Sequence, residues 1–206
     1  MSTASDKFDV FTGFTPFSTV GSYRAADYWQ LEEGAPYELL RGRLIMSPSP
    51  TTQHQLILGK LYKIFEAAEI QSDSLCYMAP MDVVFSDDTI LQPDLLYIAK
   101  DRRHIVKDRV EGPPDLAVEI LSPATGRRDK TEKLDLYAKY GVPEYWIIDP
   151  ATQVFEFLLL DDLTSGSGRY VIQQQPDDHY RSPRLPEIAI DLAAFWAEIE
   201  RRLPKT

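Results

Sequence analysis

The segment at residues 116–121, with the sequence LAVEIL, restricts the fold of this chain more than any other. Five of its six residues are apolar, and Pro113 and Pro114 mark where it begins. A strand with one face in water alternates apolar and polar residues, whereas a near-continuous apolar run is typical of a strand buried on both faces. The chain is therefore expected to hold a buried strand inside an α/β fold.

The residues before this strand predict helices mixed with strands. Apolar residues recur at the spacing of one helical face over residues 52–69, which predicts a core-facing helix there. Tyr37–Leu40 and Arg43–Met46 read as a hairpin, because Gly42 suits the tight turn between them. A short helix over residues 23–31 and strands over residues 75–78, 81–85 and 94–98 complete this half of the chain.

The residues after the buried strand also predict a mixture of helices and strands. A helix is predicted over residues 130–140, where Asp129 and Glu132 resemble a capping box and Gly141 closes the helix. Strands are predicted over residues 145–148, 154–160 and 170–173, with an SGSG loop between the last two. A final helix over residues 191–202 has Asp191 as its N-cap.

One domain over residues 23–206 is expected, preceded by an arm over residues 1–22 that lacks a helix or strand period. The length of 206 residues and the hydrophobic content of 44% suit one well-packed core. No apolar stretch approaches the ~18 residues of a membrane span, and the N-terminus lacks a signal-peptide pattern, so we expect a cytoplasmic protein. The single cysteine, Cys76, excludes an intrachain disulfide and a cysteine-based zinc site.

The formal charge is −10, which argues against a partner made of phosphates, but its distribution is uneven. Residues 100–139 hold ten basic and eight acidic side chains, a net charge of +2, so the rest of the chain carries −12. Such a cluster fits a solvated surface or a local anion site.

A carboxylate in the middle of the buried strand is the main indication of chemistry. An unpaired buried charge costs several kcal/mol, so Glu119 needs a cationic partner or a metal. Strand geometry points its side chain the same way as those of Ala117 and Leu121. An ion pair with a nearby Arg or Lys is the structural alternative.

Asp94 offers a second carboxylate at the start of a neighbouring predicted strand, directly after Pro93. Mg²⁺ is commonly held by one or two carboxylates, water and substrate phosphate oxygens. Asp94 and Glu119 therefore form a minimal candidate ligand set. Asp94 could instead serve only as a turn residue.

Three further residues are candidates with structural alternatives. Lys133 follows Asp129 by four residues, so it fits either a surface ion pair or an ammonium that stabilises charge on a phosphate. The structural alternative for Glu38 is a solvent-facing residue of the hairpin. The structural alternative for His54 is a surface residue in the first turn of a helix. The three histidines lack the spacing of a zinc site, and the chain has neither a Gly-rich phosphate loop nor a GxSxG elbow.

Four segments together carry a family resemblance: YELLRGRLIMSPSP with the following His54, QPDLLYI, PPDLAVEILSPAT and RRDKTEKLDLYAKYGVPEYWIIDP. They resemble the Uma-type family of restriction endonucleases, a branch of the PD-(D/E)XK nuclease superfamily. The resemblance covers residues 25–195. It implies a restriction-endonuclease-like fold, a mixed β-sheet flanked by helices.

The resemblance also implies a metal-dependent phosphodiesterase site. Asp94 matches the aspartate of the PD motif, and Glu119 matches the acidic position of the (D/E)XK motif. The superfamily lysine is absent two residues later, where Leu121 stands, so its role is carried to Lys133 on the next helix. Glu38 matches an accessory acid.

The resulting expectation is a homodimer that hydrolyses phosphodiester bonds in DNA with Mg²⁺ or Mn²⁺ held by Asp94, Glu119 and the carbonyl of Ile120. The first rival is an inactive nuclease-fold dimer that acts as a DNA-binding or scaffolding module, and the charge of −10 favours it somewhat. The second rival is metal-dependent hydrolysis of a smaller phosphate ester.

Overall fold

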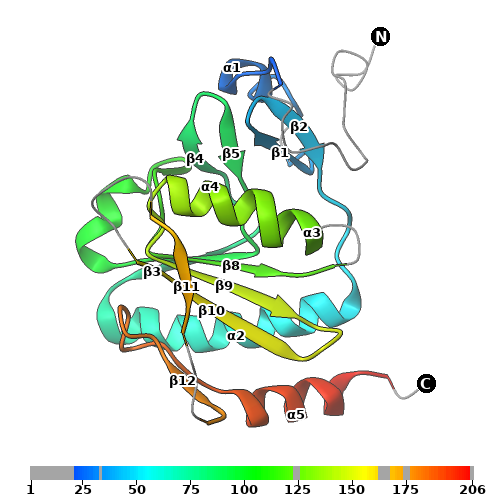
Figure 1. Ribbon diagram of the computed structural model, residues 1–206, viewed down its shortest axis with the longest axis vertical. Helices are drawn as coiled ribbons and strands as arrows, with labels where there is room; N and C mark the ends of the chain where they lie inside the picture. Colours follow the sequence, from blue (N-terminus) through cyan, green and yellow to red (C-terminus); the bar gives the residue numbers. More distant parts are fainter. Residues whose placement is uncertain (1–20, 33, 123–125, 162–167, 174–176, 205–206) are drawn as a thin grey trace.

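A six-stranded mixed sheet lies at the centre of the protein (Figure 1). We describe it from a computed structural model, which describes residues 21–32, 34–122, 126–161, 168–173 and 177–204. The strand order is β11-β10-β9-β8-β6-β3, in which β8 and β9 run parallel and the other neighbours run antiparallel. The strands are β3 (Leu75–Met78), β6 (Leu95–Ile98), β8 (Leu116–Ile120), β9 (Glu144–Asp149), β10 (Val154–Leu160) and β11 (Tyr170–Ile172).

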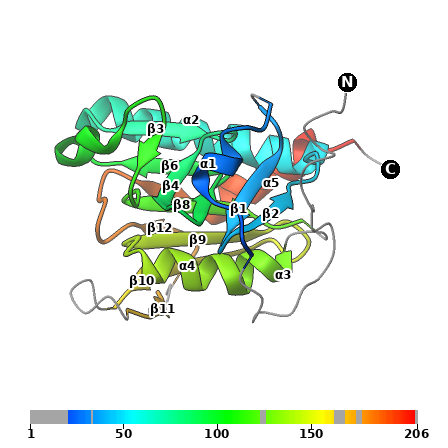
Figure 2. The same ribbon diagram turned by 90° about the horizontal axis from the view of Figure 1, so that it is seen from above.

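Helices cover both faces of this sheet, as Figures 1 and 2 show. One face packs against α2 (Thr52–Ser72) and α5 (Leu192–Arg202), and the other packs against residues 126–139, which we call the site helix. Val118 and Ile120 of β8 belong to the core on the α2 side, whereas Ala117 belongs to the core on the side of the site helix. The apolar run of β8 is therefore buried on both faces, as the sequence predicts.

A second, five-stranded sheet packs beside the first, with strand order β2-β1-β5-β4-β7. It contains β1 (Tyr37–Leu40), β2 (Arg43–Met46), β4 (Val83–Ser86), β5 (Thr89–Leu91) and β7 (Val110–Glu111). The remaining elements are α1 (Ala25–Tyr28), a 3₁₀ helix (Lys100–Ile105) and the strand pair β12 (His179–Arg181) and β13 (Ala189–Asp191). The sequence does not predict β5, β7, β12 or β13, since these segments of two or three residues show no clear alternation or apolar run of their own.

The site helix differs from its prediction at its beginning. It consists of α3 (Gly126–Arg128), a π-helical turn (Asp129–Lys133) and α4 (Leu134–Lys139). Asp129 and Glu132 therefore lie inside the helix and are buried, so the predicted capping box is wrong. The predicted N-cap of α5 is confirmed, since Asp191 Oδ1 accepts a 2.8 Å hydrogen bond from the Ala194 N–H.

Most of the expected N-terminal arm, together with most of the predicted SGSG loop, lies outside the described residues. Across the described ranges, no helix combines the length and the apolar character that a bilayer crossing requires.

The β1–β2 turn requires a glycine at its second position. Arg41 and Gly42 have φ angles of 50° and 76°, the pattern of a tight hairpin turn with two left-handed residues. The chain also passes close by, because a Cβ added to Gly42 would lie 2.4 Å from the carbonyl oxygen of Gly21. Gly141, which ends the site helix, has a similar φ of 79° but has no atom within 4 Å of an added Cβ.

These two glycines give a matched stability test. Gly141→Ala should lower the free energy of unfolding by about 1–2 kcal/mol, the cost of holding an alanine in the left-handed backbone conformation. Gly42→Ala should lower it by about 1–3 kcal/mol more, because its methyl group also meets a backbone carbonyl. Urea denaturation of both variants measures the difference, and equal losses would show that the approach of Gly21 does not constrain the turn.

Candidate active site

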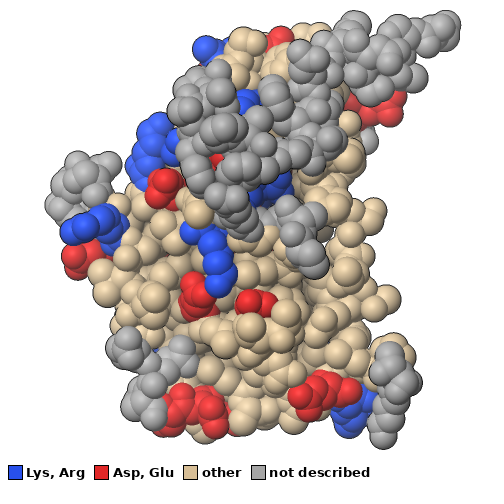
Figure 3. Space-filling view, turned by 45° about the vertical axis from the view of Figure 1, so that its right-hand side comes forward, with Lys and Arg blue, Asp and Glu red and all other residues tan. Residues whose placement is uncertain are grey.

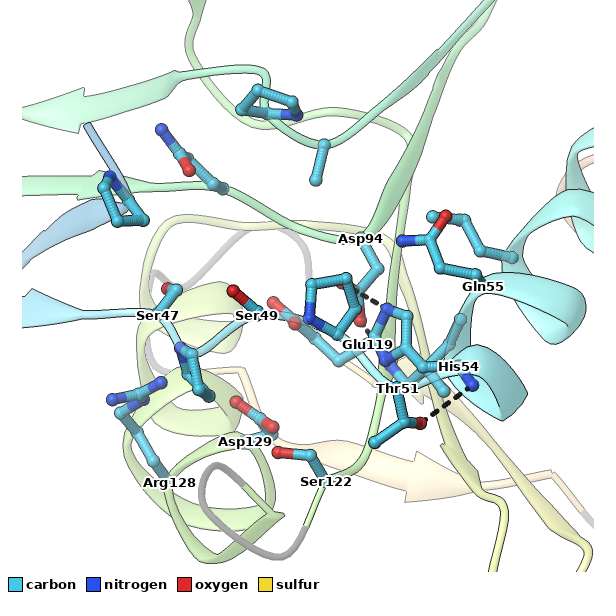
Figure 4. Close-up of a pocket in the computed structure, with 18 of the residues that line it drawn as sticks. Ser47, Ser49, Thr51, His54, Gln55, Asp94, Glu119, Ser122, Arg128 and Asp129 are labelled. Carbon is cyan, nitrogen blue, oxygen red and sulfur yellow. Dashed lines mark hydrogen bonds and ion pairs between the residues drawn. The ribbon is translucent and has the colours of Figure 1, made fainter. Parts of the chain in front are cut away.

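A pocket of about 390 Å³ opens where the two sheets meet the N-terminus of α2 (Figure 4). Asp94, Glu119, Ile120 and Lys133 all line this pocket, although they come from three separate segments of the chain. These four candidate residues from the sequence therefore converge in one place. Figure 4 shows Asp94 and Glu119 on neighbouring walls, with His54 beside Asp94.

Strand pairing brings Asp94 and Glu119 together. In the antiparallel pair of β6 and β8, Leu95 lies opposite Val118, so the residue before β6 comes next to Glu119. Asp94 Oδ2 accepts a 2.7 Å hydrogen bond from the backbone N–H of Ile120, which fixes its carboxylate on β8. Its other oxygen, Oδ1, lies 3.2 Å from His54 Nε2.

Lys133 places one ammonium group among three carboxylates. Its Nζ lies 2.7 Å from Glu119 Oε1, 2.9 Å from Glu38 Oε1 and 3.8 Å from Asp129 Oδ1. The side chain is buried, so the surface ion-pair interpretation of Lys133 and Asp129 is wrong. The reason is that the site helix packs this face onto the sheet instead of exposing it to water.

The pKa shifts follow from burial and from this arrangement of charges. Burial raises the pKa of Glu119 well above its ordinary value, and the ammonium of Lys133 opposes that shift. Burial lowers the pKa of Lys133, but the carboxylates of Glu119, Glu38 and Asp129 outweigh it and raise the pKa. Lys133 therefore stays protonated, and one positive charge faces three acidic groups.

Glu38 lies behind the pocket. It is 1% exposed, so the interpretation as a solvent-facing hairpin residue is wrong. Its Oε1 accepts a 2.8 Å hydrogen bond from the Gln92 N–H as well as contacting Lys133, and the Arg128 guanidinium lies 3.9 Å from its Oε2. Glu38 thus holds the ammonium of Lys133 in place from the side away from the pocket.

His54 belongs to the pocket and not to the surface. It lies on the first turn of α2, where its backbone N–H donates a 3.2 Å hydrogen bond to Thr51 Oγ1. Its side chain is 12% exposed and contacts Asp94. The surface interpretation of His54 is therefore wrong, because the beginning of α2 forms one wall of the pocket.

Sequence reasoning missed several residues that support the site. The Tyr137 hydroxyl donates a 2.8 Å hydrogen bond to Glu119 Oε1, and the Tyr145 hydroxyl donates a 3.1 Å bond to the Asp129 carbonyl. The buried guanidinium of Arg43 on β2 contacts the Glu132 carboxylate of the site helix. The spacing of Asp129, Lys133 and Tyr137, each four residues apart, was an available signal of one polar helix face.

A hard divalent cation fits the donors that the pocket presents. Within the described ranges, no three side chains of His, Cys, Asp or Glu form a complete metal cage. Asp94 and Glu119 nevertheless supply two carboxylates, and no hydrogen bond among the described residues ends on Glu119 Oε2. A strand residue directs its N–H and C=O to the same side, so the Ile120 carbonyl faces the side of Asp94. Mg²⁺ binds such sets of one or two carboxylates completed by water.

Comparisons with known proteins identify the fold and the family of this chain. The chain resembles a solved structure described as "a putative nuclease belonging to DUF820", from Anabaena variabilis, with a TM-score of 0.70 and 19% sequence identity. The match covers 86% of this chain and 99% of that chain, and it confirms the predicted fold of mixed sheets flanked by helices. A comparison with curated proteins gives no significant match. Residues 25–193 match the model of the Uma2 family, described as "Putative restriction endonuclease", and the chain belongs to this family.

Proposed function

We propose that this protein is a Mg²⁺-dependent endonuclease that hydrolyses phosphodiester bonds in DNA, with Mn²⁺ as a substitute metal. The observation that carries the proposal is the convergence of Asp94, Glu119 and Lys133 on one pocket. Family membership and the nuclease-like fold support the reaction class. The cation and the DNA substrate are parts of the proposal.

Each side chain of the pocket has a role in this reaction. Asp94, Glu119 and the Ile120 carbonyl would hold the cation, which supplies Lewis acidity toward a phosphate oxygen and an attacking water. Lys133, protonated and held by Glu38, presents positive charge where negative charge develops on the phosphate. The carboxylates around Lys133 raise its pKa and so favour the protonated form, which suits a charge-stabilising role.

The alternative function, an inactive DNA-binding or scaffolding module, is less consistent with the site. Replacing a buried ionic cluster with apolar residues is often neutral or stabilising, so a scaffold gains little from keeping one. Here one lysine and three carboxylates remain buried together beside an open pocket. Hydrolysis of a smaller phosphate ester, the second alternative, needs the same chemistry. The assay below distinguishes it from DNA cleavage because both DNA and nucleotides are offered as substrates.

A cleavage assay tests the proposal. Plasmid DNA, single-stranded DNA and nucleotides are incubated with the protein and Mg²⁺ or Mn²⁺, and we expect DNA cleavage that stops when EDTA is added. Asp94→Asn and Glu119→Gln should abolish it, because each removes a charged ligand. Lys133→Met should slow it about 10²- to 10³-fold, the effect of losing one donor to developing charge.

Lys130→Met is the matched control, because Lys130 lies on the same helix but pairs with Glu156 at the surface. This variant should cleave DNA at the wild-type rate. Circular dichroism checks that every variant is folded. Wild-type activity in folded Lys133→Met would contradict the role of Lys133, and hydrolysis of nucleotides without DNA cleavage would favour the smaller-ester rival.

A two-fold homodimer is also part of the proposal, since it matches the symmetry of a duplex. The apolar face of α2, which the sequence predicts as a core-facing helix, is buried in the chain's own core and is not available as a dimer interface. The edge strand β11 is a candidate interface, because its residues Val171 and Ile172 are 52% and 56% exposed. An exposed apolar edge strand favours pairing with another chain.

Light scattering at micromolar concentration should give twice the chain mass of 23.5 kDa. Ile172→Lys should yield monomers, whereas Val154→Lys, at an exposed apolar position at the start of β10, should leave the dimer intact. A monomeric wild-type protein would rule out the dimer, and a dimeric Ile172→Lys variant would rule out this edge.

A further inference from the structure

A second cavity adjoins the active-site pocket. We call it the side cavity; its volume is about 550 Å³, and its lining includes Tyr28, Trp29, Met81, Asp82, Gln92 and Arg109. Gly34, Pro80 and Gln92 line both the side cavity and the active-site pocket. The two cavities therefore lie side by side, so a molecule bound in the active-site pocket comes close to the side cavity.

The side cavity has an aromatic wall. Trp29, directly after α1, is 40% exposed, although most large apolar residues in the described ranges are buried. The Arg109 guanidinium lies 3.7 Å from the centre of the indole ring, and Tyr28 meets the indole edge-on at 4.8 Å. Aromatic rings and guanidinium planes are the surfaces on which unpaired bases stack.

The side cavity also contains hydrogen-bonding groups that suit the edge of a base. Asp82 Oδ1 accepts hydrogen bonds from the Tyr28 hydroxyl at 2.8 Å and from Gln92 Nε2 at 2.9 Å, which fixes both side chains. No hydrogen bond among the described residues uses Asp82 Oδ2 or Gln92 Oε1. These oxygens are acceptors, and the exocyclic amino groups of adenine, cytosine and guanine are donors.

Gln92 connects the side cavity to the catalytic centre. Its side chain lines the side cavity, while its backbone N–H donates a 2.8 Å hydrogen bond to Glu38 Oε1. Glu38 in turn contacts Lys133, and Asp94 follows Gln92 by two residues. A base in the side cavity would thus lie next to the phosphate group being cleaved.

We propose that the side cavity binds one unpaired nucleobase of the substrate beside the scissile phosphate. The substrate class is then DNA with an unpaired base at that position, in a single strand or in an interrupted duplex; this rests on the proposed nuclease function. The charge of the chain agrees, because −10 disfavours binding through many phosphates. Figure 3 shows one face on which small acidic and basic groups are mixed, without a broad basic surface over its described residues.

Binding in EDTA tests the side cavity separately from cleavage. Fluorescence anisotropy of the full-length protein compares three labelled probes of one sequence: a single strand, the fully paired duplex, and a duplex with one unpaired base. Wild-type protein should prefer the two probes with unpaired bases. Trp29→Leu, which keeps an apolar side chain but removes the ring, should weaken binding to those probes about 5- to 150-fold, the loss of one base stack of about 1–3 kcal/mol.

Arg103→Ala is the matched control for Arg109→Ala. Arg103 pairs with Asp73 at the surface, so its removal changes the charge equally without changing the side cavity. Arg109→Ala should reduce the preference for unpaired bases, and Arg103→Ala should leave it unchanged. If Trp29→Leu is unfolded by circular dichroism, Arg109→Ala decides the test.

The outcomes separate the two proposals. Equal affinity of wild-type protein for paired and unpaired probes, or an unchanged preference in folded Trp29→Leu and Arg109→Ala, would overturn the base site even if the protein cleaves DNA. A preference that these variants lose would support the base site even if the protein cleaves nothing, and the nuclease proposal alone would then fail.

Discussion

The burial of the Lys133 ammonium among three carboxylates is the interaction on which the site depends. Glu38 comes from β1, Glu119 from β8 and Asp129 from the site helix, so one cation joins both sheets and the helix. Removing the lysine alone, or the carboxylates alone, would leave uncompensated charge in the interior. The free energy of unfolding would then fall by about 3–5 kcal/mol. The proposed metal would add a second positive charge beside Lys133 and so favour the charged form of the Glu119 carboxylate, which burial disfavours.

The central sheet supplies the second constraint, because its register decides which groups face the pocket. Pairing of β6 with β8 sets Asp94 beside Glu119, and the hydrogen bond from Ile120 holds the Asp94 carboxylate there. The beginning of α2 adds His54, and the residue directly after β5 of the five-stranded sheet is Gln92. Asp94, Glu119 and Gln92 therefore lie on or directly beside paired strands, which hold side chains more rigidly than loops do.

Sequence reasoning predicts the parts that periodicity encodes and misses the parts that tertiary packing decides. The LAVEIL run predicts β8, and a lone carboxylate in that strand identifies Glu119 as a functional candidate, because burial of charge has a known cost. By contrast, the four-residue spacing of Asp129 and Lys133 fits an exposed pair and a buried one equally well. The π-helical turn has no local signature, and the burial of Glu38 depends on contacts with residues more than 50 positions away.

The most direct test of the account is a crystal structure with Mn²⁺, located by its anomalous scattering. The account predicts a peak about 2 Å from carboxylate oxygens of both Asp94 and Glu119, with Lys133 still contacting Glu38. A protein that binds no Mn²⁺ in this pocket at saturating concentration, or binds it only elsewhere, would contradict the assignment of Asp94 and Glu119 as the metal centre of a nuclease.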